Sequence, residues 1–113
     1  MTKEKLLALY ELYPFEKHPL WQAILNCRLT KTEVLEAEKQ HYLRTKSGQI
    51  LRMNAAQQAK GVNENIWTSL LATAMEECID SPSNPSHLEL VRRLLLEGGI
   101  DESLFQQFRP TPG

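Results

Sequence analysis

The sequence predicts an all-α protein, and three observations support this class. Apolar residues recur at helical spacing through most of the chain, and no run alternates with a period of two. Capping residues and prolines stand where such helices would begin. One stretch, 30–60, is long enough for about eight helical turns. We therefore expect a small helical bundle that is organised around this stretch.

Composition and length predict a single globular domain over residues 1–113. The chain is 42% hydrophobic and 24% charged, which is ordinary for a folded domain of this size. We expect an ordered core over about 3–107 and a frayed tail at 108–113, where two prolines and a glycine occur.

Charge and hydropathy exclude several classes of partner. A net charge of −1 with scattered basic residues predicts no nucleic-acid partner. No apolar run is long enough to cross a bilayer, and the amphipathic N-terminus does not read as a secretory signal, so we expect a cytoplasmic protein. Cys27 and Cys78, which show no CxxC spacing, are expected to be reduced and buried.

Two short helices are expected before the long one. The first runs over 3–13 with an apolar face and is stopped by Pro14. The second runs from about His18 to Asn26, with Pro19 at a first-turn position where its missing N–H costs nothing.

The long helix is predicted from Thr30 to Lys60. Thr30 and Glu33 form a capping box at its start, and Gly61 can turn the chain out of it. Its predicted inner face holds Val34, Leu35, Tyr42, Thr45, Met53 and Ala56. Glu38, His41 and Gln49 fall on the same face, with Glu38 near its centre.

Two further helices and a short turn complete the expected fold. The fourth helix opens at Asn63 and ends at about Cys78. The fifth is predicted to start with Asn84 as N-cap and proline 85 in its first turn, and to reach the glycines at 98–99. A short turn is expected around 104–105.

Three polar residues on these helices are candidate metal ligands. A carboxylate on the inner face, such as that of Glu38, must be paired, protonated or bound to a metal, and pairing with Arg92 or Arg93 is the structural alternative. Glu77 lies at the edge of the buried stripe of the fourth helix. His87 lies among apolar residues of the fifth, where a lone histidine is more often a core residue than a ligand.

Together the three candidates point to a metal site. Carboxylates and a histidine on different helices are the donors from which bundles build di-iron or di-manganese centres. His41 follows Glu38 by one turn and is a secondary candidate. The sequence lacks the motifs of a serine hydrolase and of a phosphate-binding loop.

Several segments carry a family resemblance: 18–25 (HPLWQAIL), 29–30 (LT), 38–42 (EKQHY), 76–77 (EE), 86–93 (SHLELVRR) and 96–100 (LEGGI). They resemble the haem-oxygenase-like superfamily, in the branch of thiaminase-II-like proteins, pyrroloquinoline-quinone-synthesis-C-like proteins and haem-oxygenase-like di-metal oxidases. In the metal-using members the matching glutamate and histidine are ligands, which implies Glu77 and His87 here. A further carboxylate of the family matches Glu38.

The resemblance covers only the first half of that fold. Family members are about twice as long, and their second half supplies a His-x-x-x-Asp-x-x-His helix that this chain lacks. Leu43, Ile50 and Leu51 lie off the inner stripe, on a surface that the missing half would cover. We therefore expect a homodimer, or pairing with a second half-length subunit, which either shares four carboxylates and two histidines or leaves two incomplete sites.

These observations lead to two hypotheses of different classes. The first is a non-haem iron or manganese oxidase or oxygenase that acts on a small organic molecule through Glu38, Glu77 and His87. The second is a non-catalytic helical module for dimerisation or binding, in which the site is vestigial. A hydrolase that uses Cys78 and no cofactor ranks third.

Overall fold

The computed structural model describes residues 2–112, and its regular elements within that range are all helices, which confirms the all-α class. The chain forms two compact units, Met1–Glu33 (unit 1) and Val34–Gly113 (unit 2). The expected single domain stays a prediction.

Unit 1 contains two short helices and one 3-10 turn: α1 (Lys3–Leu12), η1 (Phe15–Lys17) and α2 (Pro19–Leu25). The Oγ1 atom of Thr2 accepts a hydrogen bond from the N–H of Lys5 at 3.4 Å and caps α1. The Nδ1 atom of His18 accepts one from the N–H of Leu20 at 3.1 Å and caps α2. Both helices therefore begin where the sequence predicts.

The long helix α3 spans Lys31–Ala59 and begins with the predicted capping box. The N–H of Thr30 donates to Oε2 of Glu33 at 2.7 Å, and the N–H of Glu33 donates back to Oγ1 of Thr30 at 3.2 Å. After the helix, Gly61 has a φ of 78°, a conformation that glycine adopts without a Cβ clash. Both predicted ends are confirmed.

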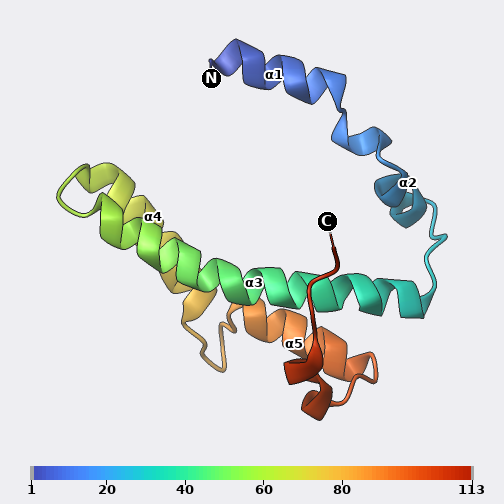
Figure 1. The fold of residues 1–113 in the computed structure, drawn as a ribbon. Helices are drawn as coiled ribbons and strands as arrows, with labels where there is room; N and C mark the ends of the chain where they lie inside the picture. Colours follow the sequence, from blue (N-terminus) through green and yellow to red (C-terminus); the bar gives the residue numbers. More distant parts are fainter. Residues whose placement is uncertain (1, 113) are drawn as a thin grey trace. The chain divides into compact units, whose positions relative to one another are not determined.

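The helix α4 (Glu64–Cys78) folds back along α3 (Figure 1). Its predicted start is confirmed, because Asn63 Oδ1 accepts from the N–H of Ile66 at 3.1 Å. At its other end the side-chain amide of Gln49 donates to the carbonyl of Glu77 at 2.6 Å. This bond fixes the end of α4 against the middle of α3.

The helix α5 (His87–Glu97) begins two residues later than predicted. Ser86 is the N-cap, and its Oγ accepts from the N–H of Glu89 at 3.2 Å. Asn84 belongs instead to the preceding turn, in which its N–H donates to Oγ of Ser81 at 3.1 Å. The Asn84-Pro85 pair therefore belongs to the turn, and α5 begins after it.

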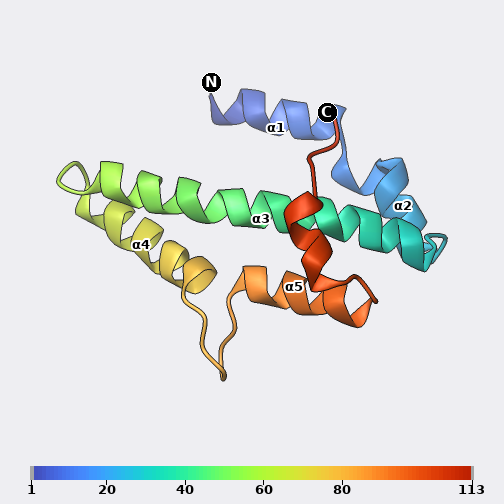
Figure 2. The same cartoon turned by 60° about the horizontal axis from the view of Figure 1, so that its bottom comes forward.

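In unit 2, α4 and α5 follow one another along one side of α3 and run opposite to it (Figure 2). The core lies between α5, the start of α3 and the turn η2 (Glu102–Gln107). Its buried members are Val91, Leu95 and Phe105, and Leu35, Tyr42, Leu96, Ile100 and Phe108 pack against them. This core holds α5 against the first half of α3.

The inner face predicted for α3 is only partly correct. Thr45 and Ala56 are buried, whereas Val34 and Met53 are 40% and 56% exposed. In unit 2 the second half of α3 is accompanied by α4, whose buried residue is Ala74. The buried residues along this part of α3 and α4, Ala56 and Ala74, are small, and Met53 stays exposed.

The segment after η2 is bound to α3, although we expected residues 108–113 to fray. Phe108 packs on the core, with its ring 5.9 Å from that of Tyr42. The side chain of Gln40 donates to the carbonyl of Arg109 and accepts from the N–H of Thr111, both at 3.0 Å. These contacts hold the chain as far as residue 111, and residue 113 lies outside the described part.

Two further predictions concern the cysteines and the membrane. Both cysteines are free, as expected, but Cys27 is exposed and not buried, because it lies in the turn after α2 with a φ of 52°. The thiol of Cys78 donates to the carbonyl of Gln49 at 3.9 Å. Over residues 2–112, none of the helices combines the length and the apolar character needed to span a bilayer.

Candidate functional site

The predicted ligands come from three helices of unit 2. Glu38 and His41 lie on α3, Glu77 is the penultimate residue of α4, and His87 is the first residue of α5. All four side chains are partly buried, with exposed fractions of 25%, 29%, 18% and 40%, respectively. They meet where α4 ends and α5 begins, against the middle of α3.

The first pair is formed within α3. The Oε2 atom of Glu38 lies 2.9 Å from Nδ1 of His41, one helical turn away. Because an ionised carboxylate only accepts, the imidazole donates through Nδ1. The Nε2 atom of His41 then keeps its lone pair in the neutral ring.

The second pair joins α4 to α5. The Oε2 atom of Glu77 accepts from Nδ1 of His87 at 3.2 Å, and the same oxygen lies 3.7 Å from Nη1 of Arg52. Glu76, the neighbouring glutamate, is exposed. The prediction that Glu77 and not Glu76 points inward is therefore confirmed.

The two histidine rings connect the pairs. The ring centroids of His41 and His87 lie 5.0 Å apart, and the rings are inclined by 72°, an edge-to-face arrangement. Glu38, His41, His87 and Glu77 thus form a continuous row, which we call the Glu-His row. The sequence placed these residues on inward faces, and the structure places them in one row.

The donors of the Glu-His row fit iron or manganese in kind, but they do not surround one point. No three Asp, Glu, His or Cys side chains within residues 2–112 are grouped as ligands of one ion. Each Glu–His pair instead resembles the carboxylate–histidine arrangement of metal proteins, in which the carboxylate orients the ring and the far nitrogen binds the metal. The two rings that would carry such nitrogens, those of His41 and His87, have their centroids 5.0 Å apart.

The structure contradicts the pairing of Glu38 with an arginine of α5. Arg92 donates to Glu89 and to Glu102, and Arg93 donates to Glu89 at 2.8 Å. The hydrogen bond with Glu102 raises the pKa of the Arg92 guanidinium. Both arginines are thus occupied on another face of α5, and Glu38 pairs with His41 instead.

A hollow of about 310 Å³ adjoins the Glu-His row at His87. The other residues of its lining come from α3: Arg44, Thr45, Gly48, Leu51 and Arg52. Arg44 and Arg52 are not among the residues predicted for the site from the sequence. Their spacing with Gly48 at i, i+4 and i+8 places all three on one helix face, which is the signal that was missed.

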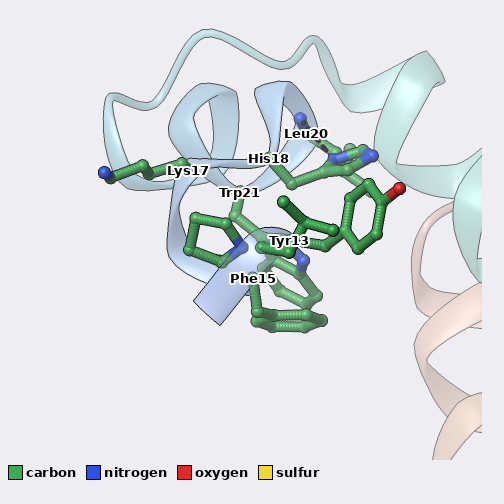
Figure 3. A pocket seen from close by; sticks show the side chains of 8 residues that line it. Tyr13, Phe15, Lys17, His18, Leu20 and Trp21 are labelled. Atoms are coloured by element: carbon green, nitrogen blue, oxygen red, sulfur yellow. Dashed lines mark hydrogen bonds between the residues drawn. The ribbon is translucent and has the colours of Figure 1, made fainter. Parts of the chain in front are cut away.

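Unit 1 has a hollow of its own, of about 480 Å³ (Figure 3). It lies between the end of α1 and α2, and its lining is largely apolar and aromatic. The rings of Phe15 and Trp21 lie 4.6 Å apart at one side of it. It contains none of the predicted ligands, and its histidine, His18, is already the cap of α2.

No family model matches the chain, and neither a curated protein nor a solved structure matches it. The resemblance to the haem-oxygenase-like superfamily therefore stays a prediction.

Proposed function

We propose that this chain provides half of a metal-dependent oxidase or oxygenase site that acts on a small organic molecule, with iron or manganese as the metal. One observation carries the proposal: side chains from three helices of unit 2 form the Glu-His row. Imidazoles oriented by carboxylates are ligands that these metals accept. The metal, when bound, supplies the redox chemistry for dioxygen.

The roles within the row follow from its hydrogen bonds. Glu38 and Glu77 hold the Nδ1 atoms of His41 and His87, which leaves both Nε2 atoms for the metal. In this proposal Glu38 and Glu77 orient the histidines, whereas the sequence predicted both glutamates as direct metal ligands. The two roles can be told apart by experiment. Loss of an orienting group weakens metal binding about 10- to 100-fold, whereas loss of a ligand removes a bond to the metal.

Two imidazoles are fewer ligands than a bundle metal centre uses, so the proposed site needs a partner. A second copy of the chain would supply the same row again through a two-fold interface. Exposed apolar residues of α3 support this proposal, since Ile50 and Leu51 are 63% and 68% exposed. A second half-length subunit is the alternative partner.

Metal content measured by mass spectrometry tests the proposal. We expect iron or manganese in the protein as purified or after anaerobic reconstitution, and its loss from His87→Ala and His41→Ala. Glu77→Gln should retain metal with about 10-fold weaker affinity, because the amide oxygen can still accept from His87. Glu76→Gln is the matched control, since this neighbouring carboxylate is exposed.

Two outcomes would contradict the metal site. One is a reconstituted protein that binds neither metal and keeps its circular dichroism spectrum in all variants. The other is equal metal loss in Glu76→Gln and Glu77→Gln, which would indicate adventitious binding to surface carboxylates.

A non-catalytic module for dimerisation or binding is the second candidate function. It is favoured by the contact of 3.7 Å between Arg52 and Glu77, which places a positive charge beside the proposed site. Under this hypothesis the row only joins the helices, so His87→Ala would change stability and dimer mass but no metal content.

A further inference from the structure

The hollow beside His87 is lined by two arginines, Arg44 and Arg52, whose side chains donate no hydrogen bond within the described residues of unit 2. Within residues 2–112, Arg44 takes part in no side-chain hydrogen bond and no ion pair. Arg52 has only the contact of 3.7 Å with Glu77, which is longer than a hydrogen bond. The donors of both guanidinium groups are therefore available at the hollow.

The other arginines of unit 2 are used differently. Arg92 and Arg93 donate to carboxylates of Glu89 and Glu102, and Arg109 donates to backbone carbonyls. The chain has 14 acidic residues, enough to pair every arginine. Among the arginines within the described residues of unit 2, the two whose side chains donate no hydrogen bond are the two that line the hollow.

The backbone at Gly48 lets one of these side chains lie across the helix. A Cβ atom at this position would come within 2.7 Å of Nη1 of Arg52. The guanidinium therefore occupies space that a larger residue at position 48 would take, and Arg52 and Gly48 both line the hollow.

We propose that this hollow binds a small organic anion through an oxyanion group, a carboxylate or a phosphate, held by Arg44 and Arg52 beside His87. Arginine donors match the two oxygens of such groups. A volume of about 310 Å³ suits a small molecule. Use of this anion as the substrate of the Glu-His row rests on the proposed function, but its binding does not.

Arginine resonances in nuclear magnetic resonance spectra test the proposal on metal-free protein. Succinate and, separately, inorganic phosphate are titrated at constant ionic strength while the Nε–Hε signals are followed. We expect saturable shifts for Arg44 and Arg52. Arg44→Gln and Arg52→Gln should each weaken binding at least about tenfold, the effect of losing one charged hydrogen bond.

Lys46→Gln is the matched control, because it removes one positive charge from the same helix outside the lining of this hollow. It should change the dissociation constant less than about twofold. Shifts with succinate alone identify a carboxylate ligand, and shifts with phosphate alone identify a phosphate. Both results support the proposal.

The proposal is overturned if neither anion gives a saturable shift, or if Lys46→Gln weakens binding as much as Arg52→Gln does. Its failure is distinct from that of the metal site. If the protein binds the anion but takes up no metal, the anion site is supported and the proposed metal-dependent function is contradicted. If it takes up metal but binds neither anion, the metal site is supported and the anion site is contradicted.

Discussion

At the scale of single residues, the hydrogen bond at Nδ1 decides what each histidine can do. His41 and His87 both donate to a glutamate, so their chemistry is confined to Nε2. Helical spacing predicted that Glu38, Glu77 and His87 face inward, since position on a helix follows from sequence. It did not predict which side chain each would meet, because the partners belong to other helices.

The capping box at the start of α3 predicts a lowered pKa for Glu33. The N–H of Thr30 and then its hydroxyl donate to the carboxylate, and both bonds lower the pKa below its ordinary value of 4.5. Carbon-13 titration of the carboxyl group should show this shift. Thr30→Ala should return the pKa partway, because the backbone donor remains.

The sign of the effect on stability follows from the lowered pKa of Glu33. The contribution of the box is present above pH 4.5 and is lost as the pH falls through the lower, folded-state pKa. Glu33→Gln should remove this part of the acid dependence of helix content, measured by circular dichroism. A carboxyl group of Glu33 that titrates at or above 4.5 would contradict the capping box.

At the scale of elements, short-range signals predicted the helices well. Caps and turn residues act within about four residues, so the starts of α3 and α4 could be read from Thr30 and Asn63. The start of α5 was misread because Asn84 and Ser86 are both good caps. The choice depends on Asp80, whose Oδ1 accepts from the N–H of Ser86 at 3.0 Å and folds the loop back.

Substitution of the two competing caps separates the observed start from the predicted one. Ser86→Ala should lower the free energy of unfolding by about 1 kcal/mol, because the N–H of Glu89 loses its acceptor. Asn84→Ala should change it by less than about 0.5 kcal/mol, since Asn84 uses only its backbone in the turn. Urea unfolding at one protein concentration measures both. The opposite ranking would place the cap at Asn84.

At the scale of the whole molecule, the described chain buries few large side chains. The only fully buried side chain below 2% exposure in residues 2–112 is Leu95, and neither α1 nor α2 has a buried residue. Large apolar residues of α3 and α4 such as Ile50 and Ile66 remain more than half exposed. Surfaces of this kind mark contacts with another chain, which supports the proposed dimer.

Light scattering after size exclusion tests the dimer. We expect twice the 13.0 kDa of one chain, and a shift to 13.0 kDa for Ile50→Glu, which places a charge on the apolar face of α3. Val62→Glu is the control, because Val62 is 83% exposed in the turn between α3 and α4. A monomeric parent protein would contradict the dimer. A dimer that Ile50→Glu leaves intact would place the interface elsewhere.

The sequence by itself determined the all-α class, the beginnings of most helices and the inward faces that carry Glu38, Glu77 and His87. These properties depend on hydrogen bonds between residues close in sequence and on the helical period, so a few neighbouring residues are enough to predict them. Only the tertiary structure decided that the two glutamates hold histidines, that Arg44 and Arg52 line a hollow beside His87, and that the segment to Thr111 binds α3. Such contacts join residues far apart in the chain, and their geometry depends on how whole helices pack.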